Sequence, residues 1–178
     1  MNLSNTIIPK SDQLNADDLI SGPRTIKIVA VEGGSAEQPV TIKYDGDNGR
    51  PYKPSKSMRR VLVSLWGADG NAYVGRRLTL FRNPLVKFAG EAVGGIQISH
   101  ASDIPEAVQI ALTETRGKRK PFRVEPLASE SELLAAGEAA AKLGTDGLRA
   151  WWAKLNAEDQ RLMKPHVEAL KAKTGGAS

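Results

Sequence analysis

The chain has 178 residues, of which 40% are hydrophobic, and its formal net charge is +5. This length allows one main domain with a small appendage and excludes two large domains. The absence of cysteine excludes disulfides, thiol nucleophiles and cysteine-based zinc sites, and it favours a cytoplasmic location.

The first part of the chain predicts a lead-in followed by two paired strands. Residues 1–24 are expected to form the lead-in, in which Asn15 caps a short helical turn. The segment TIKIVAV at 25–31 alternates and is rich in β-branched residues, which is typical of a strand. The segment QPVTIKYDG at 38–46 predicts a second strand that forms a hairpin with the first.

A short strand, a helix and two further strands follow. Prolines exclude a regular central strand at residues 50–53, which are predicted as an edge strand. Apolar residues at helical spacing predict one amphipathic helix that ends at Gly67. Alternation predicts strands at 73–84 and 93–100, separated by the turn signal Ala89-Gly90. This element order is that of the OB-fold, so we expect a mainly β domain over residues 25–104, a five-stranded OB-like barrel with a helix between strands three and four.

The remaining residues predict a basic arm and a small C-terminal helical region. Residues 105–128 are predicted as a connecting arm, with a short helix from Pro105 and the basic run RGKRK at 116–120. The pattern Ser129-x-x-Glu132 is a capping box that begins a helical tail over residues 129–173. A kink is expected at Pro165 of this tail. Residues 174–178 are expected to be disordered.

Recognisable catalytic and metal-binding patterns are absent from the sequence. It contains no phosphate-binding glycine loop, no nucleophile elbow and no zinc-binding helix motif. The two histidines, His100 and His166, lie in unrelated segments without acidic neighbours at metal-ligand spacing. We therefore expect a non-catalytic protein without a metal or other cofactor.

The central stretch of the chain is basic. Residues 41–123 carry fifteen Lys or Arg and seven Asp or Glu, a net charge of +8. Residues 1–40 carry three and five, a net charge of −2, and residues 124–178 carry seven and eight, a net charge of −1. A basic stretch favours an anionic partner, although a solvated basic face has the same composition.

Binding to a single strand of nucleic acid requires cations against phosphates and aromatic rings on which bases stack. The candidate cations are Lys43, Arg50, Lys53, Arg59, Arg60, Arg77, Arg82 and Lys87, and the candidate rings are Tyr52 and Phe81. Packing at the rim of the barrel or docking of the helical tail is an equal interpretation of the two rings. Arg59 and Arg60 are equally consistent with the solvated face of the helix. The run RGKRK fits a solvated linker, a phosphate-binding arm or a partner site.

Trp151 and Trp152 are adjacent in the helical tail. Neighbouring positions on a helix point about 100° apart, so both rings cannot enter one small core. One ring is expected to be buried, and the other is expected to contact the barrel or another protein. Both are candidate partner-binding residues, and the tail is predicted to recruit a partner or to self-associate.

Two segments resemble a group of small bacteriophage and prophage proteins. They are KYDGDNGRPYKPSKSMRRVLVSLWG and AYVGRRLTLFRNPLVKFAGEAVGGIQIS, in which a helix ends in Trp-Gly and a Tyr-Val-Gly-Arg segment precedes a strand and a glycine-rich last strand. The resemblance covers about residues 14–104 and implies an OB-like fold with a role in replication or recombination. The tail segment GTDGLRAWWAKLNAEDQRLMKPHVEALK is similar to C-terminal helical extensions of phage recombination and single-strand annealing proteins.

Two functions follow from these patterns. The first is a single-stranded DNA-binding accessory protein of phage replication or recombination, acting in the cytoplasm of the bacterial host. The second is a phage-encoded protein-interaction module that modulates or inhibits a host enzyme or defence complex, with its basic face against an acidic protein surface. No stretch of the sequence reaches the length of a membrane span, so neither function involves a membrane.

Overall fold

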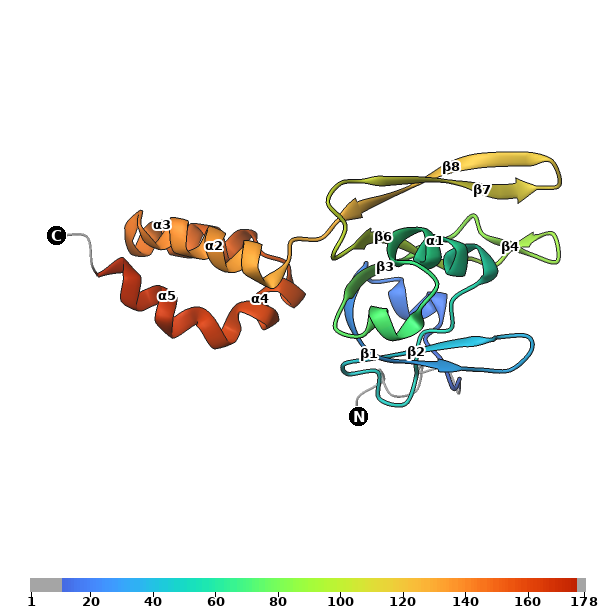
Figure 1. Cartoon of the computed structure of the whole chain (residues 1–178), viewed down its shortest axis with the longest axis horizontal. Coiled ribbons are helices and arrows are strands. Elements are labelled where there is room, and N and C mark those ends of the chain that lie inside the picture. The colour runs from blue at the N-terminus through green and yellow to red at the C-terminus, as the bar shows by residue number, and fades with distance from the viewer. Residues whose placement is uncertain (1–10, 176–178) are drawn as a thin grey trace. The chain divides into compact units, whose positions relative to one another are not determined.

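A computed structural model describes residues 11–175, and the chain divides into two compact units (Figure 1). The first unit ends at Leu127 and the second begins at Ala128. The first unit contains, in chain order, η2 (Ala16–Leu19), β1 (Arg24–Gly33), β2 (Val40–Tyr44), α1 (Lys56–Trp66), η3 (Gly70–Tyr73), β3 (Arg77–Asn83), β4 (Lys87–Phe88), β5 (Glu91–Ala92), β6 (Gly95–Ala101), β7 (Val108–Thr115) and β8 (Lys118–Pro126). The first ten residues of the expected lead-in lie outside the described residues.

Six strands form one open sheet in the order β2-β1-β3-β6-β8-β7. Neighbouring strands are antiparallel, except that β6 and β8 run parallel where His100 and Ala101 face Glu125 and Pro126. Tyr52 adds an isolated bridge to Ile42 of β2, at the position of the predicted short strand. The fold is therefore mixed α and β with an open sheet, and the predicted five-stranded OB-like barrel is not confirmed.

The predicted arm after residue 104 is wrong, because this segment forms the hairpin of β7 and β8. Alternate residues of β7, from Val108 to Leu112, pack against the core together with Phe122 and the buried Val124 of β8. These apolar positions explain why the segment pairs as strands: a helix would scatter side chains that two strands place on one face. The expected helix from Pro105 is absent from this described segment.

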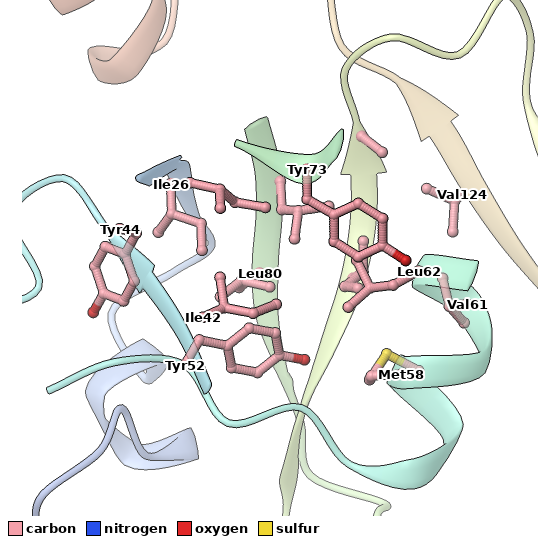
Figure 2. Close-up of a cluster of buried hydrophobic side chains, with 14 of the residues drawn as sticks. Ile26, Ile42, Tyr44, Tyr52, Met58, Val61, Leu62, Tyr73, Leu80 and Val124 are labelled. Atoms are coloured by element: carbon pink, nitrogen blue, oxygen red, sulfur yellow. The ribbon is translucent and has the colours of Figure 1, made fainter. Parts of the chain in front are cut away.

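The core of the first unit contains apolar side chains from the sheet and from α1 (Figure 2). Met58, Val61 and Leu62 recur at helical spacing and are fully buried or nearly so. Helix α1 begins where the Ser55 hydroxyl accepts a hydrogen bond from the Met58 amide at 3.3 Å. It ends at Gly67, whose φ of 88° is a conformation that other residues rarely adopt. The amphipathic helix predicted from the sequence is confirmed.

The second unit is helical, as the tail was predicted to be. Its elements are α2 (Glu130–Ala141), α3 (Gly144–Lys154), α4 (Ala157–Met163), η4 (Lys164–His166) and α5 (Val167–Thr174). The predicted capping box is confirmed, since Ser129 and Glu132 exchange two hydrogen bonds at the start of α2. The change to η4 occurs at the predicted position of Pro165. Of the residues expected to be disordered, Thr174 instead ends α5, and residues 176–178 lie outside the described residues.

Candidate nucleic-acid interface

The turn between β7 and β8 and the first three residues of β8 carry four exposed cations, Arg116, Lys118, Arg119 and Lys120, which we call the basic tip. Thr115 pairs with Lys118, so the turn itself contains only Arg116 and Gly117. Gly117 has a φ of 82°, which lets the chain reverse in two residues. Among residues 11–175, none of the four cations has an acidic partner. The basic tip therefore presents charge that no neighbouring carboxylate neutralises.

The cations of β8 are divided between its two faces. Successive residues of a strand point to opposite faces, so Lys118 and Lys120 share the face of Phe122 and Val124. Phe122 and Val124 pack against the core of the first unit. Arg119 lies on the opposite face of β8. Lys118 and Lys120 thus form an exposed basic surface on the same face of the hairpin as the residues that pack against the core.

The short hairpin of β4 and β5 exposes an aromatic ring. Phe88 is 76% exposed, and Leu85 and Val93 beside the hairpin are 76% and 52% exposed. The predicted turn is confirmed at Ala89 and Gly90, whose φ values of 51° and 88° are both positive, as a tight two-residue hairpin turn requires. Exposed apolar side chains that gather in this way are typical of an interaction site. Sequence reasoning missed Phe88 as a candidate ring.

The two hairpins extend toward the same side of the first unit (Figure 1). Lys87 of β4 is exposed and, among the described residues, has no ion pair. Lys87 is adjacent to Phe88 in the sequence. Of the cations predicted for the interface, Lys87 is the one that lies on a hairpin with an exposed ring. Together, Lys87, Phe88 and the basic tip supply both cations and an aromatic face.

Four of the predicted cations are instead held by carboxylates. The pairs are Lys43 with Glu32 at 2.8 Å, Arg50 with Asp18 at 2.7 Å, Lys53 with Asp12 at 2.9 Å and Arg82 with Asp17 at 3.5 Å. Three of these carboxylates lie in or beside η2, which packs against β3. These ion pairs neutralise four of the eight cations that were predicted to contact phosphates.

The pair of Arg50 and Asp18 is the most enclosed of the four. Two nitrogens of the guanidinium donate to the two carboxylate oxygens at 3.1 and 2.7 Å. Burial alone raises the pKa of Asp18, but hydrogen bonds from Asn15 and Arg50 outweigh it and lower the pKa below its usual value. Arg50 therefore links η2 to the segment that follows β2. A phosphate would have to displace Asp18 to reach the Arg50 guanidinium.

Two of the predicted site residues are buried. Tyr52 is 1% exposed and lies in the core near Ile42 and Met58 (Figure 2), so the prediction that it stacks on bases is wrong. Arg77 is 4% exposed, so its predicted contact with phosphate is wrong as well. Alternation alone places Arg77 on a solvent face, but β3 lies between β1 and β6 and η2 packs over it.

The other predicted residues of this surface stay predictions. Phe81 is half-buried on β3, opposite Gln97 of β6. Arg59 is half-buried and donates to the Pro54 carbonyl at 3.1 Å. Arg60 is exposed on α1.

The adjacent tryptophans of α3 point in different directions, as predicted. Their rings are 6.2 Å apart and inclined by 62°. Trp151 packs against the core cluster of the helical unit and fills the space beside Gly137 of α2. Trp152 lines an open groove together with Leu148 of the same helix. Only Trp152 is placed where a partner could contact it through that groove.

The described part of the chain has neither a cluster of metal ligands nor a helix that could span a membrane. Within residues 11–175, no three or more His, Asp or Glu side chains are grouped so that they could hold a metal ion. Each helix of that range is too short or too polar to cross a membrane.

Comparison with known families, curated proteins and solved structures finds no match for this chain.

Proposed function

We propose that this chain is a non-catalytic, single-stranded DNA-binding accessory protein of bacteriophage replication or recombination, acting in the cytoplasm of the bacterial host. One observation carries the proposal: the four cations of the basic tip have no acidic partner within residues 11–175, and their hairpin extends to the same side of the first unit as the β4–β5 hairpin, which bears the exposed Phe88. The DNA strand lies over the two hairpins, with phosphates against the cations.

The preference for a single strand follows from the chemistry of the exposed ring. Phe88 is 76% exposed and stands beside Lys87 at the start of a tight turn. Bases of a single strand offer their faces to such a ring, and each stacked base contributes about 1–3 kcal/mol. In a duplex the bases are stacked on one another, so only the cations contribute.

The strand order supports an OB-like interpretation of the sheet. Tyr52 pairs beside β2, where a third strand would lie, and β1 lies between β2 and β3, with β6 beside β3. An OB-fold is a partly open five-stranded barrel whose binding loops include the one between its last two strands. In this chain that loop corresponds to residues 84–94, which contain the β4–β5 hairpin. The β7–β8 hairpin is then an addition to the fold that enlarges the basic surface.

The phage context rests on the sequence resemblance over about residues 14–104, and fold alone does not assign function. The basic excess in residues 41–123, fifteen cations against seven carboxylates, supports an anionic partner of some kind. A protein partner with an acidic surface would need the same cations, but the exposed ring of Phe88 favours bases.

A titration of labelled oligothymidylate, about ten nucleotides long, tests the proposal through Phe88→Ala. We expect wild-type binding in the micromolar range or tighter, and a loss of about tenfold in the variant, since a stacked base is worth about 1–3 kcal/mol. The control is Leu143→Ala, which removes a side chain of similar exposure, 78%, from the helical unit. Absence of binding by the wild type, or equal affinities of the two variants, would contradict the proposal.

A further inference from the structure

The helical unit contains an open groove of about 860 Å³ that α3, α4 and α5 line. Leu148 and Leu170 in its lining are 8% and 1% exposed, and Trp152 and Val167 beside them are half-buried. The volume lies within the range of about 300–1,000 Å³ that is usual for ligand pockets. The floor of the groove thus suits one or two apolar side chains.

The rim of this groove is basic. Lys164 has no ion pair among the described residues. Arg149 and Arg161 meet only a carboxylate three residues earlier on their own helices, at 4.0 and 3.9 Å, and Lys171 meets Glu168 at 3.0 Å. Such exposed pairs contribute about 0–1 kcal/mol, so a ligand carboxylate displaces them at little cost. Four cations against one carboxylate in the lining favour an anionic ligand.

The charge of the whole unit argues against nucleic acid as the occupant. Residues 128–178 carry seven Lys or Arg and seven Asp or Glu, which leaves no net charge to attract a polyanion. The cations lie at the rim of an apolar floor, an arrangement that suits a few carboxylates and an apolar side chain better than a continuous run of phosphates. A short segment with a few carboxylates and an apolar residue satisfies both the rim and the floor.

We propose that this groove binds a short acidic segment of a partner protein. Apolar side chains of the segment occupy the floor at Trp152 and Leu148, and its carboxylates pair with Lys164, Arg149 and Arg161. This function goes beyond DNA binding and uses a different unit of the chain. Binding at the groove is possible because the two tryptophans have different surroundings: Trp151 packs against the core of the helical unit, whereas Trp152 lines the groove.

The test is an anisotropy titration of a fluorescein-labelled peptide, Glu-Asp-Asp-Leu-Phe-Glu-Glu, with the full chain. We expect saturable binding with a Kd of about 1–100 μM. Lys164→Glu, at an exposed position, should weaken binding about tenfold, and Trp152→Ala should weaken it by a similar factor. The matched control, Lys154→Glu, changes the same charge on α3 outside the groove and should leave the affinity unchanged. A peptide with Ser-Ser in place of Leu-Phe should not bind.

Several results would overturn this proposal. They are no binding at about 1 mM peptide, equal affinity for wild type and Lys164→Glu, and displacement of the peptide by oligothymidylate, which would assign the groove to nucleic acid. A concentration-dependent mass in sedimentation that Lys164→Glu abolishes would assign the groove to a second copy of the chain. Oligonucleotide titration of Lys164→Glu separates the two proposals, because DNA binding through the hairpins should be unaffected in this variant.

Discussion

Removing the charge of the basic tip tests the DNA interface quantitatively. The variant carries glutamine in place of Arg116, Lys118, Arg119 and Lys120, which are all exposed and lack acidic partners among the described residues. Each phosphate contact contributes about 0.7 to the slope of log K against log salt for a single strand, so three contacts contribute about 2.1, and about 2.8 if Arg119 on the opposite face of β8 also reaches the strand. At about 0.1 M salt these slopes correspond to losses of affinity of about 130-fold and about 600-fold, or about 2.9 and about 3.8 kcal/mol.

The assay is anisotropy of labelled oligothymidylate at a series of salt concentrations. A control variant removes the same number of charges from the helical unit, with glutamine in place of Lys142, Arg149, Lys154 and Arg161. The two variants have equal net charge, so any difference between them reports where the DNA lies. Exposed substitutions of this kind usually change stability by less than about 0.5 kcal/mol, which urea denaturation checks. Equal slopes for the two variants, or an unchanged slope in the tip variant, would refute the reasoning.

Three further predictions concern stability, measured by urea denaturation. Tyr52→Phe should raise the free energy of unfolding by about 1 kcal/mol, because it removes a buried hydroxyl that has no hydrogen-bond partner among the described residues. Asp18→Asn should lower it by about 1.5 kcal/mol at neutral pH, since Asp18 accepts two hydrogen bonds from Arg50. The pKa of Asp18 is lowered in the folded chain, so its contribution is present above the unfolded value of about 4 and disappears as pH falls through the folded value. Gly137→Ala should lower the free energy of unfolding by about 1 kcal/mol, because the new Cβ would stand 2.8 Å from the Trp151 ring and the strain exceeds the gain in helix propensity.

Local patterns predicted β1, β2 and α1 of the first unit well. β-branched alternation marks β1 and β2, and the spacing of Met58, Val61 and Leu62 marks α1. In these segments the periodicity of apolar residues and the local propensity favour the same secondary structure, so tertiary packing does not change it. The helical tail was predicted for the same reason, with its capping box at Ser129.

The β7–β8 hairpin was missed although the sequence carries a signal for it. Val108, Ile110 and Leu112 alternate, and Phe122 and Val124 alternate after the turn. Alanine, glutamate and a nearby proline favoured a helix and a linker over this pattern. A strand tolerates proline where no partner needs its amide, and β8 pairs with β6 only near its end. That the sheet is open and not a barrel could not be predicted either, because it depends on pairing between distant strands.

The candidate site was predicted only in outline. Counting cations identified a basic stretch, but the partners of Arg50 and Lys53 lie 32 and 41 residues away in the sequence. Burial of Tyr52 likewise depends on where its bridge to β2 places the ring. Of the predicted residues, Lys87 lies on the proposed surface, and Phe88 next to it could have been found from its position before the turn signal Ala89-Gly90.

The most direct test of the account is to map the DNA contact on the full chain by amide chemical shifts. A ¹⁵N-labelled sample of this 19.1 kDa protein is titrated with unlabelled oligothymidylate. We predict that the shifted amides concentrate in the β4–β5 hairpin and in the basic tip from Arg116 to Lys120. Shifts concentrated on α1 or the helical unit, with both hairpins unchanged, would contradict the proposed interface.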